Sequence, residues 1–487
     1  MIFSSIEFIV FFTIIIIAML ITKINIFAKK QLRHIILLIA SFIFYGWWDW
    51  RFCFLMLGLI TIAYFSAILI DKKFNNKLCL IIGVVTPLAA LGVFKYFNFF
   101  ISSFMAVFRI QAAASLNIIL PVGISFYTFQ SLSYTIDVYN KKMNVEKSFI
   151  KFALYIAFFP QLVAGPIVRA SSFIPQLYEE RNITLKNFST GIQIFTFGLF
   201  KKIVIADRLS VFVDEVFRAP GAFHAISLIM AVIAYSIQIY FDFSGYSDMA
   251  IGCAKCLGYD FIRNFNMPYI SRNVTEFWRR WHISLSSWLK DYLYIPLGGN
   301  RKGKVRTYIN NMLTMLLGGL WHGANWTFVI WGGLHGIALV IHKMYITHRN
   351  KILPIKNDNV PYYKYGIKKN ISYLVSIILT NIFICFCWIF FRMDNFSSAW
   401  LFISRIIFFK TGIIHIYSWL IFGFIIVLSG TLIAYRHCKK NKLMNVDGFY
   451  PLLDLSKILH LAIFLTIIGI ILGIAYTGAN PFIYFQF

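Results

Sequence analysis

A chain of 487 residues would ordinarily divide into two or three soluble domains, but the composition excludes this. Hydrophobic residues make up 59% and charged residues only 13%, about half of the roughly 25% that a soluble domain carries. The net charge of +27 lies in short Lys and Arg clusters between apolar runs, and no basic, aromatic-rich domain accompanies it, which argues against nucleic-acid binding. The composition therefore predicts a protein embedded in a lipid bilayer.

Apolar segments of about 20 residues, long enough to cross a bilayer as helices, recur along the chain. The first has no basic stretch before it, which favours a permanent span over a cleaved signal peptide. Three further segments (152–168, 188–205 and 308–321) are shorter or more polar, and we expect tilted or re-entrant helices there. The predicted spans are residues 6–28, 35–49, 53–70, 78–97, 116–139, 226–241, 327–347, 371–392, 413–435 and 456–476.

The basic loops orient these spans. If Lys29–Arg33 is cytoplasmic, the positive-inside rule places Asp49–Arg51 outside and Asp71–Lys77 inside. The same rule places loop 349–370 inside, so both termini are predicted to be extracytoplasmic. We expect a transmembrane core at 1–348 with its motif region at 240–336, a cytoplasmic loop at 349–370 and C-terminal helices at 371–487.

The middle of the chain, residues 242–306, is too polar to face lipid. Polar or non-helical backbone at membrane depth survives where it is buried in protein or lines a water-filled cavity. The predicted fold is therefore an all-α polytopic membrane bundle of roughly 10–13 spans plus re-entrant or in-plane helices around a central funnel.

His322 combines an ionisable side chain with a cramped aromatic setting. Gly319 and Gly323 allow close approach of a backbone or ligand, and Trp321 and Trp326 supply flat walls. Ionisable residues at membrane depth are costly and usually mark a functional path. An imidazole, whose pKa is about 6.5, is suited to take the proton from an alcohol that attacks a thioester. The alternative is a structural histidine that hydrogen-bonds a nearby carbonyl.

His282 lies in the sequence WRRWHIS, directly after Arg279, Arg280 and Trp281. Arginine binds phosphate in bidentate fashion, so these side chains are candidates for holding a phosphate-bearing acyl donor. The alternative is an interfacial anchor in which Trp and Arg lie at the headgroup level. The candidate catalytic residues are thus His322 and His282, and the candidates for binding substrate or donor are Arg279, Arg280, Trp281, Trp321, Asn325 and Asp242.

Other polar residues have plainer explanations. Asp242 and Asp248 are expected to form structural ion pairs with the arginines of WRRW, or to orient a histidine. Cys253 and Cys256 form a CxxC that lacks a second ligand pair at zinc spacing, so we interpret them as packing residues and predict no metal and no bound cofactor. No motif of nucleotide binding, zinc proteolysis or serine hydrolysis is present.

Three long motifs resemble those of the membrane-bound O-acyltransferase family. They are YFDFSGYSDMAIG (240–252), the run from NFNMPYISRN through WRRWHIS to GGNRKG (264–303), and MLLGGLWHGANWTFVIWGGLHG (315–336). The resemblance spans roughly residues 1–345 and is closest to the bacterial alginate O-acetyltransferase branch. It implies a helical bundle around a funnel, with the family's essential histidine at His322 and a second at His282.

The resemblance also implies a reaction. The branch works with cytoplasmic acetyl-CoA as donor and a separate extracytoplasmic transferase, of serine esterase-like type, that acetylates a polysaccharide or peptidoglycan. Related D-alanyl transfer proteins of teichoic acid synthesis use a carrier protein instead, but this chain is more similar to the acetyl branch. We therefore expect an O-acyltransferase of the bacterial cytoplasmic (inner) membrane that moves acetyl groups across the bilayer.

Two other functions use the same features. A transporter of a small polar solute or an intact acyl donor would employ the polar centre and broken helices near Gly298–Gly299, although no internal repeat is found. A scaffold that only recruits partners would tolerate replacement of both histidines.

Overall fold

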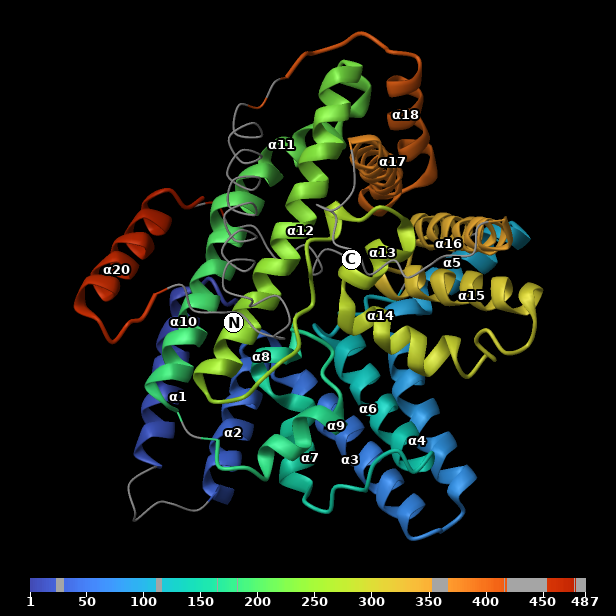
Figure 1. Cartoon of the computed structure of the whole chain (residues 1–487). Helices are drawn as coiled ribbons and strands as arrows, with labels where there is room; N and C mark the ends of the chain where they lie inside the picture. Colours follow the sequence, from blue (N-terminus) through green and yellow to red (C-terminus); the bar gives the residue numbers. More distant parts are fainter. Residues whose placement is uncertain are drawn as a thin grey trace. The chain divides into compact units, whose positions relative to one another are not determined.

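A computed structural model of the chain describes residues 1–22, 30–110, 116–163, 165–181, 183–352, 367–415, 417, 453–476 and 478. This part of the chain is helical and contains no strand beyond the isolated bridge between Phe223 and Ile413 (Figure 1). Six of its helices are long and apolar enough to cross a membrane, and three shorter ones are apolar. The fold is therefore the predicted all-α, multi-pass membrane architecture. Contacts within the chain define two units.

The first unit comprises residues 1–204, 243–263 and 447–485, as far as they are described. Two π-helical turns interrupt its helices, η2 (Gly92–Tyr96) and η4 (Lys201–Ala206), which continues into the second unit. Such turns are rare and occur frequently at functional sites. The helices are α1 (Ile6–Ile21), α2 (Lys30–Asp49), α3 (Arg51–Asp71), α4 (Asn76–Leu91), α5 (Phe97–Phe108), α6 (Ile124–Tyr139), α7 (Phe149–Ala157), α8 (Phe159–Leu162), α9 (Ala170–Phe173), η3 (Ile174–Leu177), α10 (Leu185–Phe200) and α20 (Ile458–Gly473).

Helix α6 is buried along almost its whole length although its sequence is polar. It packs against α3, α4 and α7, and its hydroxyl groups bond back to its own turns. Ser131 Oγ donates to the Tyr127 carbonyl (2.8 Å), and Thr135 Oγ1 donates to that of Ser131 (3.1 Å). Helix α4, by contrast, exposes apolar side chains such as Ile81 and Val85. This arrangement is expected in a bilayer, because polar groups are costly in contact with lipid and apolar side chains are not.

Helix α12 (Ala225–Cys256) belongs to the first unit from Phe243 onward, and there it crosses α10 at very close range. A Cβ atom on Gly198 would lie 2.5 Å from the Gly245 carbonyl oxygen, and one on Gly252 would lie 2.7 Å from that of Gly191. Small residues at such points let two membrane helices approach backbone to backbone. Both cysteines of the CxxC lie in this packed segment and are fully buried, which confirms that they are packing residues.

A buried ion pair lies beside this crossing. Lys201 Nζ donates to Asp248 Oδ2 at 2.5 Å, and both side chains are less than one-tenth exposed. An ion pair at Asp248 is therefore confirmed, but the expected arginine partner was wrong. The close helix crossing explains why lysine is the partner. Gly245 lies one helical turn before Asp248, and a Cβ atom on Gly245 would lie only 3.2 Å from Lys201 Cβ.

The second unit comprises residues 205–242 and 264–446, as far as they are described. Several of its helices are short, and those between residues 268 and 294 lie in the motif region. The helices are α11 (Asp207–Arg218), η5 (Pro220–Ala222), the first part of α12, η6 (Pro268–Ile270), α13 (Val274–Arg280), α14 (Ile283–Leu289), η7 (Lys290–Tyr294), α15 (Lys304–His322), α16 (Trp326–Ile352), α17 (Ile367–Arg392) and α18 (Phe396–Ile407).

Helices α15 and α16 form a hairpin whose backbones touch (Figure 1). A Cβ on Gly319 would lie 2.3 Å from the Phe328 carbonyl oxygen, and one on Gly332 would lie 2.2 Å from that of Met315. No larger residue fits at either point unless the helices separate. This contact holds the last residue of α15, His322, against α16.

Several predicted boundaries needed correction. The span predicted at 226–241 is too short, because the polar residues that follow are buried in protein and α12 continues to Cys256. The span predicted at 116–139 is too long, because Pro121 and Gly123 (φ 76°) delay the helix until Ile124. Most of the span predicted at 413–435 lies outside the described residues. So does most of the loop at 349–370, and the predicted division into core, loop and C-terminal helices stays a prediction.

We predict that Lys201→Ala destabilises the protein strongly, because it leaves the Asp248 carboxylate buried without its partner. Breaking such a pair costs about 3–5 kcal/mol. The matched control is Lys255→Ala, which removes a more exposed ion pair with Asp260 and should cost less than about 1 kcal/mol. Thermal unfolding of both variants in detergent measures the difference. Equal losses would contradict this assignment.

We predict that Gly332→Ala, but not Gly333→Ala, disrupts the α15–α16 hairpin. The methyl group at 332 collides with the Met315 carbonyl, whereas at 333 its nearest neighbour is Leu316 Cδ2 at an ordinary 3.5 Å. Overpacking of this kind costs about 1–3 kcal/mol or more, while alanine at 333 gains helix propensity. The yield of monodisperse protein and the melting temperature distinguish the two variants.

Candidate functional site

The region around His282 is a tight turn between two short helices of the second unit. Helix α13 begins at Asn273, whose Oδ1 accepts a hydrogen bond from the Glu276 amide (2.8 Å), and it ends before Trp281. His282 then adopts the left-handed conformation with φ 44°, which is uncommon for a residue other than glycine and recurs at functional sites. The turn starts α14 in a new direction, and the His282 side chain is completely buried.

Asn264 fixes the His282 ring. Its Oδ1 lies 3.1 Å from His282 Nδ1 and also accepts from the Ser284 amide (3.2 Å) and the Ser284 hydroxyl (2.9 Å). Since a backbone N–H can only donate, the Asn264 atom at this point is the oxygen, and His282 Nδ1 must carry the proton. Burial lowers the pKa of His282 to about 3, so the ring is neutral and Nε2 is its basic nitrogen.

His322 lies in an aromatic enclosure at the end of α15, with 3% of its surface exposed. Its ring centroid is 4.9 Å from that of Trp321, 5.0 Å from Trp331 and 5.2 Å from Phe391, and each ring stands nearly on edge to it. Trp331 comes from α16 and Phe391 from α17. Three helices therefore assemble the enclosure, and bulk water is largely kept away from the imidazole.

The two candidate histidines belong to one aromatic cluster. Trp321 contacts both, since its ring centroid lies 5.9 Å from that of His282 as well as 4.9 Å from that of His322. The cluster continues through Trp331 to a third buried histidine, His335, whose ring lies 4.8 Å from that indole. The structure thus brings together His282, Trp321 and His322, as the motifs suggested, and adds Trp331 and His335.

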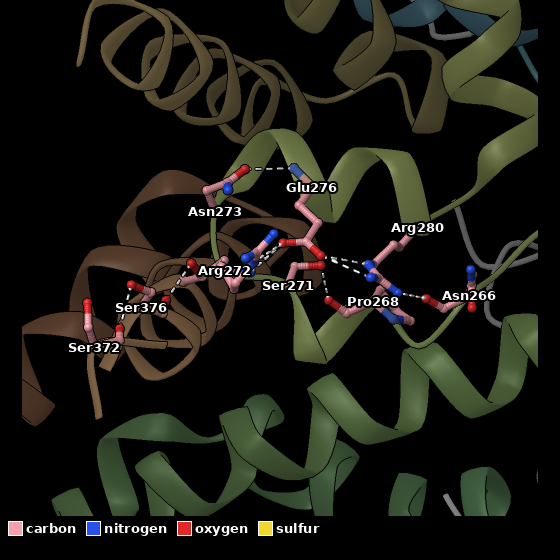
Figure 2. Close-up of polar contacts among 10 residues, drawn as sticks. Asn266, Pro268, Ser271, Arg272, Asn273, Glu276, Arg280, Ser372 and Ser376 are labelled. Carbon is pink, nitrogen blue, oxygen red and sulfur yellow. Dashed lines mark hydrogen bonds and ion pairs between the residues drawn. The ribbon is translucent and has the colours of Figure 1, made fainter. Parts of the chain in front are cut away.

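Arg280 holds the segment that carries Asn264. Its Nε and Nη2 donate to Glu276 Oε1 (3.1 and 2.9 Å), and its Nη1 donates to the Asn266 carbonyl (3.1 Å), as Figure 2 shows. The Asn266 amide donates in return to the Arg280 carbonyl (2.9 Å). Arg280 therefore ties the backbone at Asn266, two residues from Asn264, to α13, and its guanidinium already has protein acceptors.

Glu276 is shared between two arginines (Figure 2). Its Oε2 accepts from the amide and Nε of Arg272 (3.0 and 3.1 Å), while Oε1 faces Arg280. Burial by itself would raise the pKa of Glu276, but the hydrogen bonds and charges of both arginines outweigh it and hold that pKa below its usual value. The carboxylate stays ionised and keeps both guanidinium groups in place.

The remaining candidates differ in their surroundings. Arg279 is exposed on α13. Trp281 is buried, stacked on Phe277 (5.5 Å between centroids) and packed against Trp388 (5.1 Å). Asn325 caps α16 by accepting from the Thr327 amide (3.0 Å), and its Nδ2 donates to the Asp394 carbonyl (2.6 Å). Asp242 is buried in α12. Arg279 is thus the exposed cation of the set.

Sequence reasoning missed Asn264, Trp331 and His335. Asn264 precedes His282 by 18 residues, so no local spacing pairs them. Trp331 and His335 are four residues apart, one turn of α16, and this spacing of two flat rings was an available signal in the sequence. Among the described residues no group of His, Cys, Asp and Glu could hold a metal ion.

Comparison with known proteins identifies the family. Residues 129–389 match the model of the MBOAT, membrane-bound O-acyltransferase family, and this range contains His282, His322 and His335. The chain is 37% identical to a "probable alginate O-acetylase" of Pseudomonas putida over 483 residues, 94% of this chain and 95% of that protein. A protein of the same description from Pseudomonas aeruginosa is 42% identical over 378 residues, 76% of this chain and 69% of that one.

A peptidoglycan O-acetyltransferase of Helicobacter pylori is 40% identical over 392 residues, 74% of this chain and 71% of that protein. These similarities cover most of the chain, and the family range includes Trp321, Trp331 and the three histidines of the cluster. The chain is therefore an O-acyltransferase, and it belongs to the membrane-bound O-acyltransferase family.

Proposed function

We propose that this O-acyltransferase moves acetyl groups from cytoplasmic acetyl-CoA to a hydroxyl on the way to an extracytoplasmic polysaccharide or peptidoglycan. The observation that carries the proposal is the buried His322 imidazole inside its aromatic enclosure, in a chain similar along most of its length to O-acetylating proteins. A catalytic base kept from bulk water suits transfer of an acyl group to an alcohol instead of to water.

The reaction needs one proton to be moved. A nitrogen of the His322 imidazole removes the proton from the acceptor hydroxyl as its oxygen bonds to the thioester carbonyl carbon. The carbon–sulfur bond then breaks, the sulfur leaves with the bonding electron pair, and the imidazolium returns the proton to it. The products are the acetyl ester and the free thiol of coenzyme A. No metal, redox partner or nucleotide hydrolysis is required.

His282 supplies a second imidazole, and the Trp321 indole lies between it and His322. Because Asn264 accepts from Nδ1–H, Nε2 is the nitrogen that carries the lone pair in the neutral ring. Arg280 supports this arrangement through the segment at Asn266, so we assign it to positioning and not to phosphate binding. Arg279, being exposed, is the better candidate for the phosphates of coenzyme A.

The relatives support a class of acceptor. Their descriptions name alginate and peptidoglycan as the polymers that are O-acetylated. We propose the same acceptor class here, reached through a separate extracytoplasmic transferase of serine esterase-like type. The enzyme would then reside in the bacterial cytoplasmic membrane with both termini on the outer face, as the basic loops predict.

We predict that His322→Ala and His322→Gln lower acetyl transfer by about 10²–10⁴-fold, because removal of a general base costs a factor of that order. Protein in lipid nanodiscs is supplied with radiolabelled acetyl-CoA, and acetyl ester formation on an oligosaccharide acceptor is measured together with thiol release. The matched control is His348→Ala on the exposed end of α16, which should retain the wild-type rate.

The same assay separates an enzyme from a transporter. An acyltransferase releases coenzyme A thiol from acetyl-CoA with no gradient across the membrane, whereas a transporter leaves the thioester intact. Full glycan O-acetylation in cells that carry His322→Ala at the normal protein level would reject the proposal.

We predict that Asn264→Ala slows acetyl transfer by roughly 10–100-fold, the factor expected when a buried polar group loses its partner. The substitution removes the acceptor that sets the His282 tautomer. Ser284→Ala is the control, because it removes a hydroxyl from the same Asn264 oxygen and leaves the His282 contact intact. If both variants lose activity equally, Asn264 acts only through packing of the turn.

A further inference from the structure

Two buried N–H donors lie side by side next to His322. Trp331 and His335 are one turn apart on the same face of α16, with ring centroids 4.8 Å apart and exposed fractions of 1% and 0%. Neither Trp331 Nε1 nor His335 Nε2 has a hydrogen-bond partner among the described residues. A buried donor without an acceptor costs free energy, and two at one place mark a site that a ligand completes.

The His335 tautomer follows from its neighbour. Trp278 Nε1 lies 3.2 Å from His335 Nδ1, and an indole nitrogen can only donate. His335 Nδ1 must therefore present its lone pair, and the proton of the neutral ring is on Nε2. Trp331 Nε1 always carries a hydrogen. The pair consequently consists of two donors, and a single acceptor oxygen with two lone pairs offers one acceptor position to each of them.

The position of this pair points to the reacting group. The Trp331 ring also stands on edge to His322, with 5.0 Å between centroids. The Trp331 ring thus contacts both the proposed base, His322, and the second donor, His335. A phosphate would bring charge into an aromatic enclosure at a high desolvation cost, whereas a thioester carbonyl is neutral and offers one oxygen with two lone pairs.

We propose that Trp331 Nε1–H and His335 Nε2–H bind the carbonyl oxygen of the thioester and stabilise the negative charge that develops there. The assignment rests on the acyl transfer proposed above. When the acceptor oxygen bonds to the carbonyl carbon, the carbonyl π electrons move onto this oxygen, and the two donors hold the oxyanion without giving up their protons. Collapse of the intermediate reforms the C=O bond and expels the thiolate.

The test compares two unreactive donor analogues on the full-length protein in nanodiscs. One is a ketone analogue of acetyl-CoA, in which a methylene replaces the thioester sulfur, and the other is S-ethyl-CoA, which lacks the carbonyl oxygen. Wild-type protein should prefer the ketone. Trp331→Phe and His335→Phe keep an aromatic ring but remove one N–H, and each should lower that preference about tenfold and the rate of acetyl transfer about 100-fold.

Further variants separate the donor from its packing. His335→Gln offers an amide donor and an oxygen for Trp278, so it should recover most of the preference that His335→Phe loses. Phe383→Leu removes the ring that packs on His335 at 5.5 Å but removes no donor, and its preference should stay at the wild-type value. If Trp331→Phe does not fold, a benzothienyl alanine at 331 removes the N–H within the same ring shape.

The outcomes distinguish this inference from the proposed function. The donor pair alone would be overturned if Trp331→Phe and His335→Phe both kept the wild-type preference and rate while His322→Ala was inactive. Wild-type transfer by His322→Ala, or no binding of either analogue to wild-type protein, would overturn the proposed acetyl transfer and the donor pair with it. Recovery by His335→Gln combined with loss in His335→Phe supports the assignment.

Discussion

The backbone contact between α15 and α16 is the constraint on which the site depends. Gly319 and Gly332 let the two helices touch carbonyl to Cα, and that contact places the last residue of α15 against α16. His322 can be enclosed by Trp331 and Phe391 only while this spacing is kept. In lipid, where apolar contact between helices gains little over contact with acyl chains, such close packing is what specifies a helix pair.

Near this hairpin, a network of polar side chains holds the His282 ring. The Glu276 carboxylate is shared by two arginines, and one of these ties down the segment that carries Asn264. Asn264 in turn decides which nitrogen of His282 is basic. Hydrogen bonds and the short backbone segment between Asn266 and Asn264 thus connect a partly exposed ion-pair network to a completely buried imidazole.

Three histidines and three tryptophans form one continuous cluster from His282 to Trp278. Imidazole and indole are well matched for such a site, because both are flat and both carry N–H donors that survive burial if an acceptor is supplied. In the proposed reaction, the same cluster keeps water away from the thioester. The cluster lies in a chain of the membrane-bound O-acyltransferase family, and this supports the proposed role in acyl transfer.

Much of the fold follows from local sequence. Apolar runs of bilayer length and their basic loops predict a helical membrane protein, because lipid leaves the backbone no other way to satisfy its hydrogen bonds. The motifs WRRWHIS and WHGANW likewise singled out His282 and His322. Boundaries were least accurate where polar residues are buried in protein, as in the second half of α12, because hydropathy reports the composition of a segment and not its neighbours.

The sequence by itself thus determined the medium, the helical class, the family resemblance and two of the histidines. Only the tertiary structure decided that Asp248 pairs with Lys201, that Arg280 binds Glu276 and the Asn266 carbonyl, that Asn264 contacts His282 and that His335 packs against Trp331. These facts depend on contacts between residues far apart in the chain. Periodicity and spacing carry no record of such contacts, because helix crossing, not sequence distance, sets which side chains meet.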